Sequence, residues 1–384
     1  MMGGDVQTFA IEALTWPDNS VALREQVREL VAAHADRSDP IRSANCWNAP
    51  DPAFSRALGA AGLIGMTWPK EYGGHERSPL ERYIVLEELL AAGARVGAHW
   101  ISDRQTGTLL LRYGHEEQRR RWVPGMARGE VYACIGLSEP NAGSDLASVR
   151  SNARRDGKDW IINGQKVWTT NAHHAHVMIA LIRSVEGSER NAGLSQFVIP
   201  MDAPGVTVRP IYDLTGTHDF NEVFFEDVRL PETALVGTEG NGWNQVTAEL
   251  SLERCGPERY LTNTFLFTEF LRAVGPEPSE SIRALIGRIG ADMWTLRQMS
   301  ASVAAQIARG VDPALEATIV KDLGNSFEQA LPELIQAAIE VDLSADDALS
   351  LLLGNLLQIS PSFSLRGGTR EILKGIIARG LGLR

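Results

Sequence analysis

The spacing of hydrophobic positions changes twice along the chain, and each change marks a different kind of structure. In residues 21–34, apolar side chains recur three and four positions apart, the spacing of a helix with one buried face. Residues 80–92 and 105–113 show similar spacing, and Pro50-Asp51-Pro52 is typical of a helix start. The pattern predicts a mostly helical domain over residues 1–130.

From residue 131 the pattern changes to short runs of β-prone residues separated by turn residues. The runs cover 160–162, 165–169, 177–182, 195–199, 206–211 and 222–228. Asn163-Gly164 lies between the first two runs, and Asn-Gly in that setting is a strong hairpin signal. These features predict a small antiparallel β domain over residues 131–240, with a hairpin turn at Asn163-Gly164.

Helical spacing returns after Gly242 and continues to the end of the chain. Apolar residues between Trp243 and Leu271 predict one long helix. Further helices are predicted over 282–307, 315–339, 346–357 and 371–379. Residues 241–384 are therefore predicted to form a helical bundle, and the fold class is α+β multidomain: helical domain, β domain, helical bundle.

Composition narrows the range of functions. The chain has 384 residues, too many for one ordinary core, and a formal charge of −11 with no basic patch, which argues against nucleic acid as a partner. The sequence contains no run of 18 apolar residues, so no membrane span is predicted. It does not start with basic residues followed by an apolar stretch, so export is not predicted either. Cys46, Cys134 and Cys255 are far apart, which suits reduced thiols in the cytoplasm rather than a disulfide framework.

Two stretches carry the most specific chemistry. Residues 136–148 read Gly-Leu-Ser-Glu-Pro-Asn-Ala-Gly-Ser-Asp-Leu-Ala-Ser, a loop of small residues with hydroxyls at Ser138 and Ser144. About twenty residues later, period-two alternation places Trp168 and Thr170 on one face of a strand. A flavin ring needs such a flat apolar wall and a nearby donor. Taken alone, each stretch has an ordinary explanation, namely a Trp packed in a sheet or plain turn chemistry.

Together, in this order and at this distance, the two stretches resemble the flavin-binding centre of the acyl-CoA dehydrogenases. The order of helical, β and helical segments is also similar to that family over nearly the whole chain. The resemblance implies FAD as cofactor, bound in part by Leu137, Ser138, Ser144, Trp168, Thr169 and Thr170. It places Ser144 between the flavin and the thioester of an acyl-CoA substrate. The family usually has Thr at position 138, and Ser keeps the hydroxyl.

The resemblance also identifies a base. Oxidation of an acyl thioester removes an α-proton, and the base must be a carboxylate in a water-poor pocket. Many members place this Glu in a Glu-Gly-Thr run before the last helix, where this chain has Gly367-Gly368-Thr369. One branch places it in a Leu-x-x-Glu-Arg run, and residues 250–254 read Leu-Ser-Leu-Glu-Arg. Glu253 is therefore the expected base, with Arg254 beside it.

Alternatives remain for these positions. A Glu-Arg pair on a helix is often a solvated face, although Pro257 removes an N–H four residues after Glu253 and predicts a distorted helix there. Glu258 and Glu371 are competing carboxylates.

Two more roles in the C-terminal loop follow from the resemblance. The Gly367 N–H would donate to the thioester carbonyl, with Gly368 beside it, although a Gly-Gly hinge explains these glycines equally well. Thr369 and Glu371 lie where the family contacts the flavin. The strand-like spacing of His173, His174 and His176 does not predict a metal site.

The family binds the adenine and pyrophosphate of FAD through a neighbouring subunit, which lends an Arg-x-x-Phe stretch and a Gly-Gly turn. Residues 272–279 and 338–344 stand in these places and contain neither motif. In this respect the chain resembles the heteromeric α2β2 acyl-CoA dehydrogenases of actinobacterial steroid degradation. The missing half-site implies a second acyl-CoA dehydrogenase-like subunit as partner.

The expected activity is oxidation of an acyl-CoA to the trans-2-enoyl-CoA, with an electron-transfer flavoprotein as the family's electron acceptor. A flavin-poor, non-catalytic subunit and an acyl-CoA oxidase on the same fold are the alternatives. The acyl chain stays open among branched, long, aromatic and steroid side-chain thioesters.

Overall fold

The computed structural model describes residues 9–254 and 256–383, and for residues 250–253 it describes the backbone alone. The chain forms two compact units, each assembled from segments that are distant in sequence. The helical unit comprises Met1–Trp47, Ser78–Arg95 and Ser251–Arg384, and the sheet unit comprises Asn48–Arg77 and Val96–Leu250. The predicted order of helical, β and helical segments is confirmed, while the boundaries after residues 130 and 240 stay predictions.

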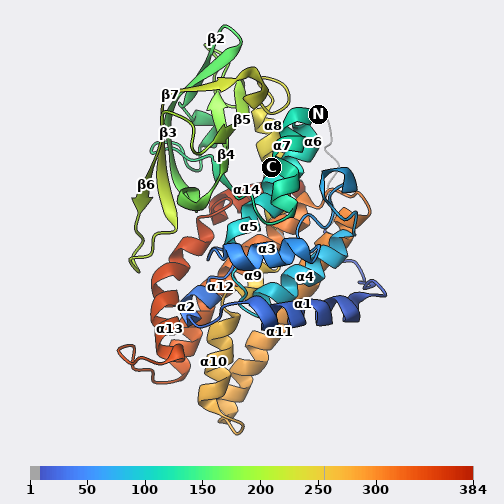
Figure 1. The fold of residues 1–384 in the computed structure, drawn as a ribbon. Coiled ribbons are helices and arrows are strands. Elements are labelled where there is room, and N and C mark those ends of the chain that lie inside the picture. Colours follow the sequence, from blue (N-terminus) through green and yellow to red (C-terminus); the bar gives the residue numbers. More distant parts are fainter. Residues whose placement is uncertain (1–8, 255, 384) are drawn as a thin grey trace. The chain divides into compact units, whose positions relative to one another are not determined.

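The sheet unit contains seven strands and several helices. The strands are β1 (Ala133–Gly136), β2 (Asn152–Asp156), β3 (Asp159–Thr170), β4 (Val177–Arg183), β5 (Leu194–Pro200), β6 (Val206–Ile211) and β7 (Phe220–Pro231) (Figure 1). Its helices are α3 (Pro52–Ala60), α5 (Gly97–Ile101), α6 (Gly107–Tyr113), α7 (Glu116–Ala127) and most of α8 (Gly242–Glu253). As predicted, α3 starts at the Pro50-Asp51-Pro52 sequence, where Asp51 accepts a hydrogen bond from the N–H of Phe54.

The strands pair in the order β1-β4-β2-β3-β7-β6, with β5 on β4. Most pairs are antiparallel, but β1 runs parallel to β4, so the sheet is mixed rather than purely antiparallel. The predicted strand ranges from residue 177 onward agree with β4 to β7 within a few residues. Parallel pairing joins segments about forty residues apart and leaves no local turn signal to read.

The hairpin predicted at Asn163-Gly164 is wrong. These residues lie inside β3, where the register with β7 shifts between Ile162 and Gly164. Gly164 has a φ of 146°, and a Cβ there would lie 2.3 Å from the Ser151 hydroxyl oxygen. The extra residue lies on β7, because two steps along β3 face three steps along β7, where Asp227 has a φ of 48°. Asn163 lies opposite this bulge and its side-chain oxygen accepts from the Asp227 N–H, while Gly164 allows the close approach of Ser151. The true turn is two residues long, at 157–158 between β2 and β3.

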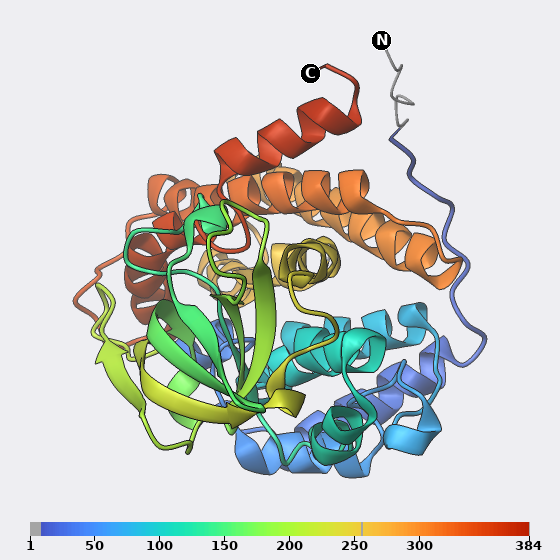
Figure 2. The same cartoon turned by 90° about the horizontal axis from the view of Figure 1, so that it is seen from above.

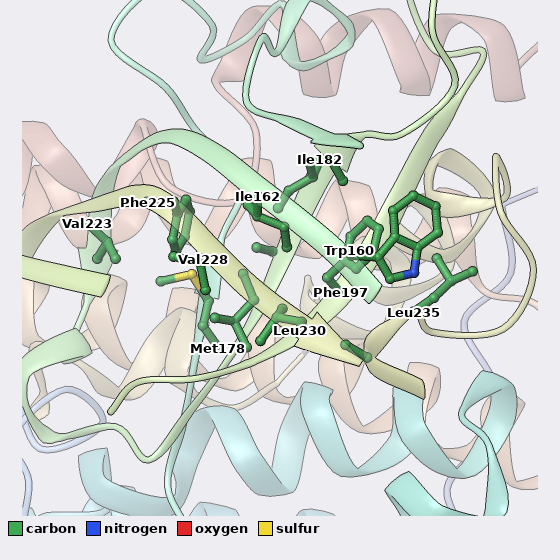
Figure 3. Packing of buried hydrophobic residues seen from close by; sticks show 14 of the residues in the cluster. Trp160, Ile162, Met178, Ile182, Phe197, Val223, Phe225, Val228, Leu230 and Leu235 are labelled. Carbon is green, nitrogen blue, oxygen red and sulfur yellow. The ribbon is translucent and has the colours of Figure 1, made fainter. Parts of the chain in front are cut away.

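One core cluster lies on the sheet and includes side chains from β3, β4, β5 and β7 (Figure 3). Trp160 of β3 has no exposed surface, and its ring meets the Phe197 ring edge-on at 5.2 Å between centroids. The Arg155 guanidinium lies 3.9 Å from the centre of the Trp160 ring. These contacts fix β3 within the unit at the end opposite to Trp168.

The helical unit contains the remaining helices. They are α1 (Ser20–His34), α2 (Pro40–Ala44), α4 (Pro79–Ala91), α9 (Glu258–Leu261), α10 (Thr264–Val274), α11 (Glu280–Ala308), α12 (Ala314–Ala338), α13 (Ala348–Ile359) and α14 (Arg370–Gly380). The long helices α11 and α12 pack against each other, drawn in orange in Figure 2, and α14 packs on α12. Among the described helices, none is long and apolar enough to cross a membrane.

The single long helix predicted after Gly242 is wrong, because three helices stand there. α8 ends at Glu253, α9 starts at Glu258, and α10 follows from Thr264. Pro257 is the N-cap of α9. The distortion predicted from this proline is therefore confirmed, and it is a complete break in the helix.

Candidate functional site

A buried ion pair attaches the loop after β1 to strand β3. The Lys166 side chain has no exposed surface, and its Nζ lies 2.7 Å from Oε1 of Glu139. The same Nζ donates to the Leu137 carbonyl at 3.2 Å. Burial lowers the pKa of Lys166 to about 8, against the opposing effect of Glu139. Burial acts to raise the pKa of Glu139, but Lys166 and backbone donors outweigh it and hold that pKa below its ordinary value.

The carboxylate of Glu139 also binds the far end of the loop. It accepts hydrogen bonds from the N–H groups of Arg150 at 2.6 Å and Ser151 at 2.9 Å. The N–H of Val167 donates to the Ser138 carbonyl at 2.9 Å. The backbone of the predicted flavin loop is thus fixed to β3 immediately before Trp168. The sequence prediction missed Lys166 and Glu139, although Glu139 lies inside the quoted motif.

Trp168 occupies a bulge of β3. The register with β7 runs from Lys166 opposite Val223 to Thr169 opposite Asn221, so two residues of β3 face one residue of β7. Trp168 has a φ of 60°, which is uncommon for a residue other than glycine and costs on the order of 1–3 kcal/mol. The bulge leaves its side chain 60% exposed, with the Phe220 ring edge-on at 6.0 Å. A large aromatic ring is therefore exposed at a position with strained backbone, and such positions are common in binding sites.

The other predicted flavin residues of the sheet unit differ in exposure. Thr170 is half-buried, while the Thr169 side chain is buried and its hydroxyl has no hydrogen-bond partner among the described residues. Leu137 and Ser138 are half-buried, and Ser144 is exposed. Exposure alternates along 168–170, but Trp168 lies in the bulge, so its common face with Thr170 stays a prediction. A flat ring, a neighbouring hydroxyl and a fixed loop backbone suit an isoalloxazine ring.

The helical unit holds the other group of predicted residues. Arg254 is buried, with 7% of its surface exposed, and its Nη1 donates to the Thr318 hydroxyl at 3.3 Å. A Cβ on Gly368 would lie 3.9 Å from Nη2 of Arg254, so the structure brings these two residues together. A solvated helix face does not describe Arg254. The side chain of Glu253 lies outside the described part of the chain.

Gly367 and Gly368 both have left-handed backbone, with φ values of 63° and 101°. Any other residue at 367 would be strained there, so the glycine suits the shape of the loop as well as the absence of a carboxylate. Thr369 caps α14, and its hydroxyl accepts from the N–H of Ile372 at 3.5 Å. These residues form a Gly-Gly turn directly before the capped start of the last helix.

The competing carboxylates have contrasting surroundings. Glu371 is exposed in the first turn of α14, and a backbone hydrogen bond and Thr369 hold its pKa below the ordinary value. Such a carboxylate is a weak base. Glu258 is buried on α9, with Oε1 3.5 Å from Nη2 of Arg259. The reaction needs a carboxylate whose pKa is raised towards neutral, and that of Glu371 is lowered. Glu258 is distinguished by the cation beside it.

Two buried charges on α12 act on the loop before Gly367 and were missed by the sequence prediction. Lys321 donates from Nζ to the Arg366 carbonyl, and Glu328 lies 3.6 Å from the Arg366 guanidinium. That guanidinium lies over the rings of Trp47 and Phe363, at 4.3 and 4.6 Å. Burial raises the pKa of Glu328, opposed by Arg366. These contacts anchor the loop immediately before Gly367.

The histidines near the end of β3 form a ring cluster. His173 stacks on His218, with centroids 4.0 Å apart, and also contacts His174. Asn221 binds both His173 and His218 through its side-chain oxygen. Within residues 9–254 and 256–383, no group of three or more His, Cys, Asp or Glu side chains is placed to hold a metal ion.

Comparisons with known proteins cover both units. The model for the acyl-CoA dehydrogenase N-terminal domain matches residues 17–130, and the model for the acyl-CoA dehydrogenase middle domain matches residues 134–228. Acyl-CoA dehydrogenase IpdE1 of Mycobacterium tuberculosis is 33% identical over an alignment of 391 residues, gaps included, which covers 99% of this chain and 98% of that protein. IpdE1 of Mycolicibacterium smegmatis is also 33% identical, over 99% of this chain and 98% of its own.

Solved structures give the same result. A structure named Tcur3481-Tcur3483 steroid ACAD has a TM-score of 0.86 and 25% identity, covering 97% of this chain and 99% of its own. The ChsE4-ChsE5 complex from Mycobacterium tuberculosis has a TM-score of 0.84 and 25% identity, over 97% and 99% of the two chains. The resemblance seen in the sequence is thereby confirmed, and the chain belongs to the acyl-CoA dehydrogenase family of oxidoreductases.

Proposed function

We propose that the chain is the catalytic-type subunit of an FAD-dependent acyl-CoA dehydrogenase, which oxidises an acyl-CoA to the trans-2-enoyl-CoA. One observation carries the proposal. Trp168 is displayed on a strained bulge, next to a loop whose backbone is fixed by a buried ion pair. A protein that had lost its flavin would have no reason to keep a 60% exposed Trp at a costly φ.

The residues divide the reaction between them. FAD, when bound, supplies the hydride acceptor. Glu253 removes the α-proton, and Arg254 is the cation next to it in the chain. The N–H of Gly367 donates to the thioester carbonyl and stabilises the charge that develops there, an effect usually worth a few kcal/mol. In the sheet unit, Trp168, Thr170, Ser138 and Leu137 would hold the flavin, and Ser144 would contact both the flavin and the thioester.

Glu253 is preferred as the base for reasons of elimination and sequence. Gly367 has no carboxylate, Glu371 is exposed with a lowered pKa, and Glu258 lies against Arg259. The Leu-x-x-Glu-Arg run ends in a buried Arg254 close to Gly368. The run lies at the end of α8, directly before the break that precedes α9, and so it is not part of one continuous helix face.

A second acyl-CoA dehydrogenase-like subunit is part of the proposal. The place of the Arg-x-x-Phe motif begins at Arg272 but has no Phe three residues later, because the chain turns at Gly275 after the end of α10. Arg272 itself pairs with Glu269, and residues 338–344 contain no Gly-Gly pair. Two structural relatives are named as pairs of different proteins, Tcur3481-Tcur3483 and ChsE4-ChsE5. Because the former is named a steroid ACAD, steroid-derived acyl thioesters are the first substrate class to test.

The assembly is tested by counting flavins. Expressed alone, the chain should purify with well below one FAD per chain, because the lending half-site is missing. Co-expressed with an acyl-CoA dehydrogenase-like chain that carries the Arg-x-x-Phe and Gly-Gly motifs, it should form a heteromer with about one FAD per pair of unlike subunits. FAD binding and assembly stabilise each other by linkage. Native mass and flavin absorbance on one sample measure this.

A homomer that holds one FAD per chain would contradict the heteromeric proposal but not the activity. A colourless heteromer would contradict the catalytic role and favour a flavin-poor subunit. Anaerobic addition of an acyl-CoA that bleaches the bound flavin supports dehydrogenation. An electron-transfer flavoprotein is the proposed acceptor in the cytoplasm, and peroxide formation under air without it would identify an oxidase instead.

Trp168→Ala tests the flavin wall. The substitution should weaken FAD retention or shift the visible flavin spectrum, because the ring loses its aromatic neighbour. The free energy of unfolding should change little, since most of the side chain is exposed. Flavin absorbance per chain and a urea titration measure the two effects. An unchanged spectrum and affinity in the folded variant would remove Trp168 from the site.

A further inference from the structure

The buried ion pair between Lys166 and Glu139 is not explained by stability alone. Opposite charges taken out of water lose hydration, and a well-packed apolar pair is often as stable or more so. Lys166 nevertheless has no exposed surface and Glu139 only 8%. A pair kept in such a place needs a role that apolar side chains cannot perform.

The hydrogen bonds show what that role is. Lys166 binds the Leu137 carbonyl on one side and Glu139 on the other. Glu139 in turn receives the N–H groups of Arg150 and Ser151. Three backbone positions of one loop are thus joined to a single side chain of β3, either directly or through one carboxylate. Methionine and leucine offer no donors or acceptors to do this.

The lysine stem is also closely confined. A Cβ on Gly136 would lie 3.1 Å from Cγ of Lys166 and 2.6 Å from Sδ of Met178, so the stem passes directly against the end of β1. Lys166 is the last residue in register before the bulge that carries Trp168. A displaced Lys166 would move the loop and the bulge together.

We infer that Lys166 and Glu139 are positioning residues, which hold the Leu137-Ser138 backbone at a fixed distance from Trp168 and so set the affinity and the spectrum of the flavin. The inference rests on the proposed function, because it assigns the pair to the flavin site. The pair does not touch the reacting atoms. It acts through the loop and the bulge.

The test compares three variants of the full chain, each in the flavin-holding assembly. Lys166→Met leaves the Glu139 charge buried without its cation, so it should weaken FAD binding by at least about tenfold and shift the visible spectrum. Lys166→Met with Glu139→Gln removes both charges and keeps one oxygen acceptor, so it can retain one of the two hydrogen bonds that the Arg150 and Ser151 N–H groups make to different oxygens of Glu139. It should fold more stably than the single variant and recover part of the affinity. Lys166→Met with Glu139→Leu keeps no acceptor and should not recover it.

Arg128→Met provides a matched control in the same unit. Its guanidinium pairs with Glu130 at 2.8 Å, but both side chains are largely exposed. Loss of such a pair should leave the FAD affinity and spectrum unchanged. A structural role for Lys166 would lower the urea midpoint while the folded protein binds FAD as the wild type does, and that result would overturn the inference.

Hydrogen exchange separates this inference from the proposed function. Backbone amides at 150, 151 and 167 should exchange faster in Lys166→Met than in the wild type, whether or not flavin is bound. A wild-type assembly without FAD would defeat the proposed function, and faster exchange would then still support the control of the loop. Unchanged exchange in folded Lys166→Met would overturn the inference even if the wild type binds FAD.

Discussion

Glu253→Gln is expected to lower turnover by about 10²- to 10⁴-fold, the usual effect of removing a general base. Gln has nearly the same size and shape as Glu but cannot accept the α-proton. Flavin content and acyl-CoA binding should therefore stay close to those of the wild type. Stopped-flow reduction of the bound flavin by an acyl-CoA measures the chemical step, and ligand titration measures binding separately.

Glu333→Gln is a suitable control for this experiment, because Glu333 is an exposed carboxylate of α12 in the same unit. It should reduce flavin at the wild-type rate. Turnover of Glu253→Gln within a few-fold of the wild type would eliminate Glu253 as the base. The same comparison with Glu258→Gln would then locate the carboxylate that replaces it.

Trp160→Ala is expected to destabilise the protein by about 3–5 kcal/mol, the range for a fully buried large aromatic side chain. Trp160 is completely buried, contacts Phe197 edge-on and lies under the Arg155 guanidinium. Its removal leaves a cavity that neighbouring strands cannot fill without losing pairing. Urea unfolding followed by circular dichroism measures the change.

Trp168 lies on the same strand and gives the opposite expectation, which makes the two variants controls for each other. Trp160→Ala should affect stability and leave the flavin spectrum of the folded fraction unchanged. Trp168→Ala should affect the flavin and leave stability nearly unchanged. Equal destabilisation by both substitutions would show that exposure does not distinguish their roles.

The spacing of hydrophobic residues was sufficient to locate most helices and strands, but not to predict how the strands pair or where the turns lie. The amphipathic spacing of 21–34 predicts α1 almost to the residue, and the β-prone runs coincide with β4 to β7. Asn163-Gly164 was misread because the same dipeptide that suits a tight turn also suits a strand position opposite a bulge of β7, with a close approach to Ser151. The parallel pairing of β1 with β4 depends on contacts between distant segments, which no local pattern encodes.

The sequence was sufficient to predict the site residues that are exposed or half-buried, but not the buried charged residues that hold them in place. Trp168, Thr170 and the loop at 137–144 stand out as an aromatic residue and hydroxyls among small residues. Lys166 does not, because a lysine is assigned to the surface unless a buried partner is known. Lys321 and Glu328 were missed for the same reason, since their partner Arg366 becomes a neighbour only when α12 packs on the loop before α14.

The backbone at Gly367 bears on how the base position can change between related chains. A glutamate placed at 367 would have to adopt left-handed backbone, at about 1–2 kcal/mol, or reshape the turn that offers the N–H. Gly368 also lies in the left-handed region, with a φ of 101°, so the turn uses glycine backbone at two successive positions. Returning a carboxylate to position 367 therefore has a backbone cost that the same exchange at an ordinary φ would not have. The two base positions are separated by the shape of the loop as well as by the identity of the side chain.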